Sequence, residues 1–462
     1  MVVAALALVG VLSAQATVPH LGYGFNVDSI DVQTLQNMDF NWIKVFSPPG
    51  PLGKYVLLRI DANAGNLSNL TAFGNAVKQI AIANQGHIQA YEIGNEVNLD
   101  ASFGWNAPPN PISYTSLLCT AYANIKAADP NAILVSAGLA PVGRVQTMPG
   151  NPDGSNGQIQ DERQYLQQLI AAGGGACLDV VGLHPYGFSA DYNATPDVYS
   201  MDSTQNCANG LCFRTAEMLY QVMQANGLGD KKMWATEFGW LTAPPNDCFN
   251  DPTYGPDWQG RIWQIVSADK QASNLAGAFQ YADANWPWMG AMFVFNLNWN
   301  QDPNVNICDQ MRYYSVQGAP AQDALTNMPK NVANIPGKLK TDSSLLSLMV
   351  GVNEQPITLT TAVGLNNWGW NSVLYTATVN ADAAVTPTLV NPAGVLSGTI
   401  YLPLNMTVSS AGYLTGVYTG LITVNLSALG VASPTPRLVT IQLNVVQDIH
   451  RVYLPLVVRN SQ

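Results

Sequence analysis

Two glutamates in this chain lie in local sequences that suit catalytic carboxylates. Glu96 follows a short apolar stretch in Tyr91–Asn98 (YEIGNEVN), and Glu237 lies in Ala235–Trp240 (ATEFGW). Two carboxyl groups held about 5–5.5 Å apart across a sugar ring can divide the work of bond cleavage. One attacks the anomeric carbon and the other transfers the proton. The pair therefore predicts acid/base and nucleophilic chemistry on a glycosidic bond.

Apolar runs that alternate with amphipathic stretches predict the elements that would position this pair. Over residues 17–328 the alternation is typical of a (β/α)8 TIM barrel, an α/β fold. In such a barrel the carboxyl ends of the strands face the active site, so Glu96 and Glu237 should emerge on one face. The eight strands are expected at Gly22–Val27, Trp42–Phe46, Val56–Ile60, Gln89–Ile93, Ile133–Ala137, Val180–Leu183, Met233–Ala235 and Met292–Phe295.

Helix start signals support the same alternation. Helices are expected from Ser113, Asp161 and Phe213, and a single long one over Trp258–Tyr281. Only the short segment Ser47–Tyr55, rich in proline and glycine, separates the second and third strands. We therefore expect no full helix there and a thin wall on that side of the barrel.

The remainder of the chain has a different composition. Residues 341–447 contain no cysteine and only four charged residues, and alternating apolar runs recur between turn clusters. This pattern predicts a smaller all-β sandwich, preceded by a linker at 329–340 and followed by a tail at 448–462. Trp368 and Trp370 could form a sugar platform or pack in the sandwich core.

The first 16 residues resemble a signal peptide. Val2–Leu12 is apolar or glycine throughout and too short to span a bilayer, and Ala14-Gln15-Ala16 offers a cleavage site. No lysine or arginine precedes Lys44, so a basic leading region is missing and a buried strand is the alternative. We predict a secreted or extracellular protein.

Six cysteines agree with secretion, and six free buried thiols are the alternative. Cys207 and Cys212 flank a short turn, and the loops after the seventh and eighth strands bring Cys248 near Cys308. The remaining pair is Cys119 and Cys177.

Charge excludes several classes of partner. The net charge is −11, from 19 basic and 30 acidic residues. Binding to nucleic acid or to an anionic membrane surface requires clustered basic residues, and this chain has too few for either partner. The four histidines are scattered at positions 20, 87, 184 and 450, so we expect no metal and no cofactor. We expect a monomer whose partner is a carbohydrate.

Four motifs, in order and spacing, resemble those of clan A glycoside hydrolases. Tyr91–Asn98 resembles the motif that ends their fourth strand, and Ala235–Trp240 is similar to their seventh-strand nucleophile motif. Leu183–Gly187 (LHPYG) resembles their sixth strand, and Trp299 matches the aromatic residue after the eighth. The resemblance covers residues 20–328 and is nearest to family 39-like and family 5-like members.

The resemblance implies roles for individual residues. Glu96 would be the acid/base and Glu237 the nucleophile of a retaining mechanism. Asn95 would hold the sugar 2-hydroxyl, Tyr186 would hydrogen-bond the nucleophile, and His184 would support the network. An arginine is expected beside the nucleophile; Lys44 and Arg59 are candidates, and we favour Arg59. Glu92 is expected to be structural.

Aromatic residues offer faces for sugar rings, whose C–H groups pack on them. Six tryptophans lie near strand ends or long loops: Trp105, Trp240, Trp258, Trp286, Trp288 and Trp299. We expect about half of them to be core residues. The others, Trp240 and Trp299 included, are expected to contact the sugar.

The predicted function is a secreted retaining glycosidase that cleaves β-glycosidic bonds in poly- or oligosaccharides. A non-catalytic carbohydrate-binding or surface protein on a barrel scaffold, and a transglycosidase, are the alternatives. Residues Arg451–Leu456 look like a short tail seen on secreted bacterial proteins.

Overall fold

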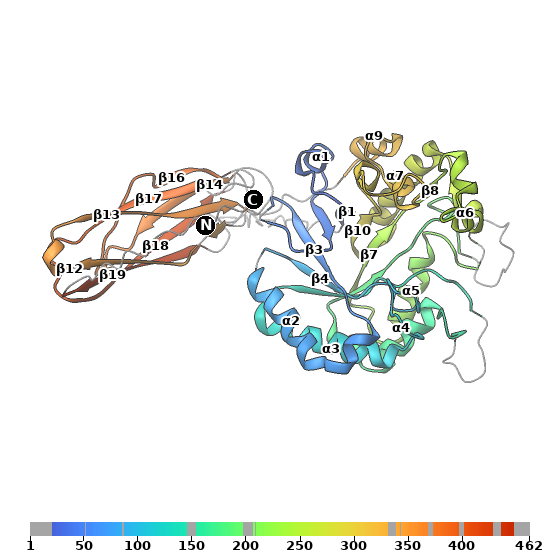
Figure 1. Ribbon diagram of the computed structural model, residues 1–462, viewed down its shortest axis with the longest axis horizontal. Coiled ribbons are helices and arrows are strands. Elements are labelled where there is room, and N and C mark those ends of the chain that lie inside the picture. The colour runs from blue at the N-terminus through green and yellow to red at the C-terminus, as the bar shows by residue number, and fades with distance from the viewer. Residues whose placement is uncertain are drawn as a thin grey trace, which may run out of the picture.

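The computed structural model describes most of the chain between residues 21 and 447. The described ranges are 21–50, 52–85, 87–145, 154–196, 207, 209–330, 339–341, 343–367, 373–396, 402–427 and 436–447. They form a closed parallel barrel with surrounding helices and a second, mostly β domain (Figure 1). The predicted fold class, a (β/α)8 barrel followed by a smaller sandwich, is confirmed.

Eight parallel strands close the barrel in the order β1-β10-β7-β6-β5-β4-β3-β2. All eight coincide with predicted strands, and β7 and β10 are longer than expected. Nearly every strand residue is buried, because helices cover the outside and side chains fill the inside. The strands are β1 (Gly22–Asn26), β2 (Trp42–Val45), β3 (Tyr55–Ile60), β4 (Ala90–Ile93), β5 (Ile133–Ser136), β6 (Val180–Leu183), β7 (Lys232–Phe238) and β10 (Met289–Val294).

The helices of the barrel begin at side-chain caps that the sequence carries. Asn69, Asp161 and Ser267 each accept a backbone N–H in the first turn of the helix that follows. The helices are α1 (Val32–Asn37), α2 (Leu70–Ala83), α3 (Pro111–Ala128), α4 (Glu162–Ala171), α5 (Thr215–Ala225), α6 (Gly255–Arg261), α7 (Ala268–Asn285), α8 (Met311–Tyr314) and α9 (Pro320–Asn327). Short 3-10 turns are η1 (Ala64–Asn69), η2 (Gly174–Cys177), η3 (Asn246–Asn250), η4 (Ile262–Gln264) and η5 (Trp299–Gln301).

The long helix predicted over Trp258–Tyr281 is wrong. The chain leaves α6, passes through η4 and forms the short strand β9 (Ile265–Val266), which pairs with β8 (Leu241–Thr242). Ser267 then caps a new helix, α7. β-Branched residues at 265 and 266 favour the strand, and a serine cap favours a restart, so local chemistry overrides the apolar period.

The link between β2 and β3 is as expected. Its described residues, 46–50 and 52–54, contain no helix. Without a covering helix, Phe46 remains partly exposed at the rim of the barrel.

Three disulfides join the predicted pairs. Cys119 bonds Cys177, Cys207 bonds Cys212, and Cys248 bonds Cys308. No described cysteine is free. The Cys248–Cys308 bond, with Cα atoms 5.1 Å apart, ties the segment after β7 to the segment after β10, because these strands are neighbours in the closed barrel.

The C-terminal domain consists of two sheets. One has the order β11-β13-β17-β15, and the other has the order β12-β19-β18-β14-β16. A continuous apolar core contains residues from both, including Val363, Met406, Ile422 and Ile441. The strands are β11 (Leu339–Thr341), β12 (Leu345–Gly351), β13 (Thr358–Asn367), β14 (Val373–Val379), β15 (Thr388–Leu389), β16 (Ala393–Leu396), β17 (Leu402–Ser409), β18 (Gly416–Ser427) and β19 (Arg437–Val446), with η6 at Val352–Glu354.

The first strand of this domain starts at Leu339, two residues inside the predicted 329–340 linker. The signal-peptide-like segment, the pair Trp368 and Trp370, and the tail at 448–462 lie outside the described residues. Among the described helices, none combines the length and apolar character that crossing a membrane requires.

Candidate active site

Glu96 is held by an unusual backbone at the end of β4. Gly94 and Glu96 both have positive φ, 87° and 42°, so the chain turns sharply as it leaves the strand. At Gly94 a side chain would meet the carbonyl of Ala62, and only glycine adopts that conformation easily. The N–H of Glu96 donates to the carbonyl of Gly138 at 3.0 Å. This turn aims the carboxylate across the barrel mouth.

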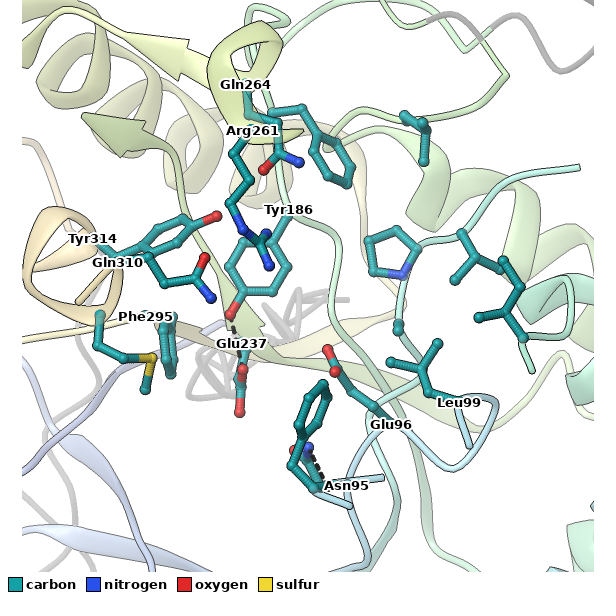
Figure 2. Close-up of a pocket in the computed structure, with 18 of the residues that line it drawn as sticks. Asn95, Glu96, Leu99, Tyr186, Glu237, Arg261, Gln264, Phe295, Gln310 and Tyr314 are labelled. Atoms are coloured by element: carbon teal, nitrogen blue, oxygen red, sulfur yellow. Dashed lines mark hydrogen bonds between the residues drawn. The ribbon is translucent and has the colours of Figure 1, made fainter. Parts of the chain in front are cut away.

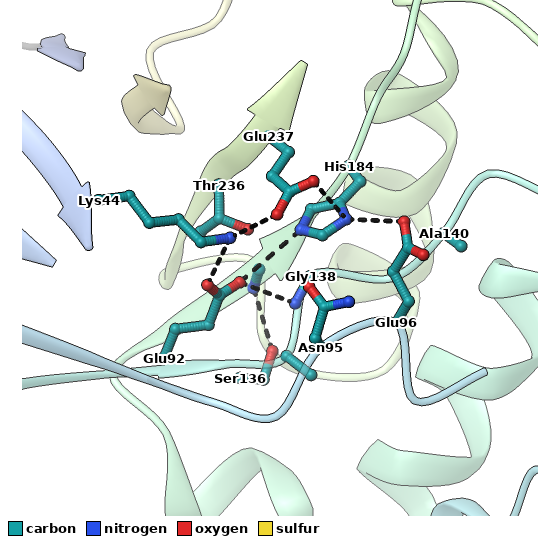
Figure 3. A network of polar contacts seen from close by, with 12 residues as sticks. Lys44, Glu92, Asn95, Glu96, Ser136, Gly138, Ala140, His184, Thr236 and Glu237 are labelled. Atoms are coloured by element: carbon teal, nitrogen blue, oxygen red, sulfur yellow. Dashed lines mark hydrogen bonds and ion pairs between the residues drawn. The ribbon is translucent and has the colours of Figure 1, made fainter. Parts of the chain in front are cut away.

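Glu237 lies on β7 and is nearly buried. Lys44 Nζ is 2.9 Å from its Oε1, and the Tyr186 hydroxyl donates to its Oε2 at 2.8 Å. Lys44, on β2, is fully buried. The carboxylate is therefore held in one orientation by a hydroxyl (Figure 2) and a cation (Figure 3).

His184 links the two glutamates. Its Nδ1 lies 3.0 Å from Glu96 Oε1 and 3.7 Å from Glu237 Oε2. One oxygen of Glu96, one of Glu237 and one nitrogen of His184 all lie within 4.8 Å of one another. The two carboxyl groups thus face each other at short range, as the sequence predicts.

A third carboxylate, Glu92, lies beneath this pair. Its Oε2 is 2.8 Å from Lys44 Nζ, and its Oε1 accepts the N–H of Gly138 at 3.1 Å and faces His184 Nε2 at 3.8 Å. Glu92 is fully buried inside the barrel, as expected of a structural residue, and it also contacts two residues of the site. A carboxylate and a lysine within otherwise apolar strands are the sequence signal that could have identified this ion pair.

The buried charges fix each other's ionisation. Burial opposes the charge of Glu92, but Lys44 and His184 lower its pKa to about 2. Burial likewise opposes the charge of Glu237, and His184 and Lys44 bring its pKa below the usual value. Burial alone would lower the pKa of His184, but the charges of Glu237, Glu92 and Glu96 raise it to about 9. At neutral pH, Glu237 is therefore ionised and His184 is protonated.

A cavity of about 620 Å³ opens above these residues (Figure 2). Glu96, Glu237, Asn95 and Tyr186 line its floor. Arg261, Gln264, Gln310 and Tyr314 project into it from the segments after β7 and β10. The helix break at η4 places Arg261 and Gln264 there, which explains why periodicity could not find them.

Asn95, His184 and Tyr186 all belong to the site. The amide of Asn95 donates to the Phe103 carbonyl at 3.0 Å, while its buried Oδ1 has no hydrogen bond among the described residues. Trp299, also expected to contact sugar, is partly exposed and packs against Phe46 and Phe295, which line the cavity, but Trp299 is not itself among the described lining residues.

Two predictions need correction. Lys44 is the cation at Glu237, whereas Arg59 lines the cavity rim, pairs with Asp61 at 3.0 Å and lies over the Phe46 ring. Lys44 is in register with Leu57, so Arg59 lies two residues nearer the carboxyl end of β3, at the level of the cavity.

Trp240, expected to contact sugar, is fully buried and does not line the cavity. Its Nε1 donates to the Ala190 carbonyl at 2.8 Å, and the ring fills the space against Gly187. Trp105, Trp258 and Trp286 are also core residues, so four of the six tryptophans pack inside, one more than expected.

Glu96, His184 and Glu237 are arranged closely enough to be considered as metal ligands. Lys44 already neutralises Glu237 at 2.9 Å, and the charge on His184 would repel a divalent cation. The donor set therefore fits an ion-paired carboxylate site better than a metal centre.

No protein-family model and no curated protein matches the chain. Similar solved structures include a family 39 glycoside hydrolase from the gut symbiont Bacteroides cellulosilyticus WH2, at 14% identity, TM-score 0.42, and coverage of 84% of this chain and 80% of that chain. A glucosidase from Croceicoccus marinus gives 10% identity, TM-score 0.44, and coverage of 84% and 96%. An α-L-arabinofuranosidase from Thermotoga maritima is similar at 10% identity and a TM-score of 0.40, with coverage of 82% of this chain and 88% of that chain.

Proposed function

We propose that this protein is a retaining glycoside hydrolase that cleaves β-glycosidic bonds in glycosides built from common sugars. The observation that carries the proposal is the short distance between Glu96 and Glu237, whose nearest oxygens lie within 4.8 Å at the floor of the cavity. Retaining enzymes hold their carboxyl groups about 5–5.5 Å apart, and inverting enzymes need roughly 6.5–9.5 Å to admit a water. The motif resemblance to clan A glycoside hydrolases points the same way.

In the first step, the Glu237 carboxylate attacks the anomeric carbon while the bond to the leaving oxygen breaks. Glu96, in its protonated form, gives its proton to that oxygen. Lys44 and the Tyr186 hydroxyl hold Glu237 ionised and oriented, which favours attack. Asn95 lines the cavity beside Glu96, and we assign it to the sugar 2-hydroxyl.

In the second step, water attacks the glycosyl ester and Glu96 takes its proton, so that the sugar leaves and Glu237 is restored. His184 lies 3.0 Å from Glu96 and carries a proton at neutral pH. It can therefore hydrogen-bond the Glu96 carboxylate and orient it as the base that accepts the proton of the attacking water. This arrangement needs no cofactor.

A 2-deoxy-2-fluoro glycoside with an activated leaving group tests the proposal, because fluorine slows the second step and traps the ester. Intact mass spectrometry on a panel of such sugars should show one added glycosyl unit, and peptide mapping should place it on Glu237. Proton NMR of the first-formed sugar should show the anomeric configuration of the substrate. An inverted first product, or labelling elsewhere, contradicts the mechanism.

The acid/base assignment has its own test in the variant Glu96→Ala. Activated aryl glycosides need little protonation, so they should lose less activity than unactivated substrates. Azide needs no general base and should restore turnover of the activated substrates as the glycosyl azide. Equal losses on both substrate types, without azide rescue, would remove Glu96 from this role.

The proposal also places the chain outside the cell. Three disulfides form and persist in oxidising compartments, and a secreted hydrolase meets its carbohydrate there.

A further inference from the structure

The cavity has two unlike sides. The side near Glu237 carries hydrogen-bonding groups from Arg261, Gln264, Gln310 and Tyr314, interspersed with the apolar side chains of Trp263, Phe295 and Met311 (Figure 2). The side near Glu96 is lined by side chains that contain only carbon and hydrogen. We call this second side the apolar wall; its described residues are Leu99, Phe103, Ala140, Pro141, Val142 and Ile159.

The backbone of the apolar wall is also occupied. The N–H of Leu99 donates to the backbone carbonyl of Glu96 at 2.9 Å, and the Leu99 carbonyl accepts from the N–H of Trp105 at 2.9 Å. The N–H of Ile159 donates to the side chain of Asn156 at 2.9 Å, and its carbonyl accepts from the backbone of that same residue at 3.2 Å. These two residues therefore offer no free peptide group to a ligand.

Two buried polar side chains complete the pattern. The Asn98 amide donates to the Ala140 carbonyl at 2.9 Å and accepts the Ala140 N–H at 2.9 Å. Glu162 Oε2 accepts the N–H groups of Val142 and Gly143, both at 3.1 Å. Pro141 has no N–H, and the Phe103 carbonyl already accepts from Asn95. The side chains of the wall thus present C–H groups to the cavity, and Asn98 and Glu162 hold Ala140 and Val142 in place from behind.

From this wall we infer the substrate class: the leaving group is an apolar aglycone, aromatic or aliphatic, and not a second sugar. The inference rests on the proposed function, because a general acid lies beside the leaving oxygen and so places the leaving group on the Glu96 side. Sugar hydroxyls pressed against this wall would lose water without gaining partners. An apolar aglycone loses only unfavourable contact with water. The sugar ring itself lies on the polar side.

The test compares substrates that share one sugar. A benzyl glycoside and an octyl glycoside represent aromatic and aliphatic aglycones, and a disaccharide represents a second sugar. Benzyl and octyl alcohols are poorer leaving groups than a sugar hydroxyl, so chemistry alone favours the disaccharide. We expect kcat/KM for at least one apolar substrate to exceed that for the disaccharide by about tenfold or more, since two buried CH₂ groups suffice for that factor. A disaccharide cleaved as fast or faster would overturn the inference.

The glycosyl fluoride of the same sugar separates this inference from the proposed function. Fluoride has no aglycone, so its release depends on the catalytic pair and the polar side alone. If no glycosyl fluoride in the panel is cleaved, the proposed function fails. If the fluoride and the disaccharide are cleaved and the apolar glycosides are not preferred, only the aglycone inference fails.

Variants of the wall give a second, independent measure. Ile159→Asn places an amide on the wall, and the preference for benzyl glycoside over disaccharide should fall by about fivefold or more. Val142→Thr is nearly isosteric and should lower the same ratio by a smaller factor if the first variant folds poorly. Ile112→Asn, at a site 69% exposed on α3 and outside the cavity lining, is the matched control and should keep the ratio. An unchanged ratio in both wall variants contradicts the inference.

Discussion

The barrel and the sandwich bury different kinds of side chain. In the barrel, Lys44, Glu92, His184 and Glu237 are all buried together within hydrogen-bonding or ion-pair distance. In the described part of the sandwich, Ser410 is the single buried polar side chain, and the core is otherwise aliphatic and aromatic. Buried charges cost free energy unless each is paired, whereas an apolar core only gains from burial. The barrel therefore accepts a cost in folding free energy to keep charged groups buried, whereas the sandwich is stabilised by apolar packing.

The largest expected effect comes from the charged group that would react. Glu237→Gln preserves shape but cannot form the glycosyl ester, so turnover of every substrate should fall by roughly 10⁴-fold or more. Steady-state rates on activated aryl glycosides measure the loss, and thermal unfolding of the same samples checks that the barrel is folded. Substantial activity in a purified, folded variant would break the nucleophile assignment.

Removing the third carboxylate tests whether the buried charges depend on one another. Glu92→Gln leaves Lys44 and His184 with one fewer negative partner, and breaking a buried ion pair typically costs about 3–5 kcal/mol. We expect a loss of that order in the free energy of unfolding by chemical denaturation, together with a lower pKa for His184 by NMR titration.

The control is Asp191→Asn, which removes an exposed pair with Lys270 at 2.9 Å and should change stability by about 1 kcal/mol or less. Equal effects of the two substitutions would show that burial adds nothing to the Glu92 pair.

A core substitution in the sandwich tests whether the loss of apolar packing there lowers stability without changing catalysis in the barrel. Ile441 is fully buried in β19, so Ile441→Ala should destabilise that domain by about 2–5 kcal/mol. Because no charge is disturbed, kcat/KM below the unfolding temperature should stay within about twofold of the parent, given that point changes far from a site act mainly on stability. Calorimetry measures the loss of stability, and kinetics on the same preparation measure kcat/KM. A large loss of kcat/KM would show that the sandwich contributes to catalysis.

The last expected effect is on the pH dependence of stability. The pKa of His184 is about 9 in the folded protein and near 6.5 when unfolded, so the folded state binds its proton more tightly. Its contribution is fully present below pH 6.5 and is lost as the pH rises through 9. The free energy of unfolding, from denaturation curves between about pH 6 and 10, should therefore fall more steeply with pH for the parent than for His184→Asn. Parallel pH profiles would mean that this proton is not linked to folding.

The sequence predicted most of what periodicity and motifs can encode. All eight barrel strands, the three disulfide pairs and the second domain follow from runs of apolar residues, cysteine placement and composition. The facing of Glu96 and Glu237 follows too, because strand ends in a barrel share one face.

What could not be predicted depends on packing between distant segments. Lys44 and Arg59 stand on neighbouring strands and both occupy inward-facing positions, so the level of each residue along its strand decides which one meets Glu237. Trp240 follows the nucleophile closely in sequence, yet its ring turns into the core. The position of Arg261 and Gln264 in the cavity depends on a helix break at η4 that local β-branched and serine chemistry produces. None of these leaves a periodic signal.

The Cys248–Cys308 bond has a practical consequence for anyone producing this protein. The 60-residue separation that it closes includes Arg261 and Gln264, and Gln310 lies just beyond it. Closing such a ring removes chain entropy from the unfolded state, about 4 kcal/mol for a ring of this size in the simplest treatment. A chain made in a reducing cytosol would lack this tether. Expression should therefore use an oxidising compartment, with free thiols counted before any sugar-binding measurement is interpreted.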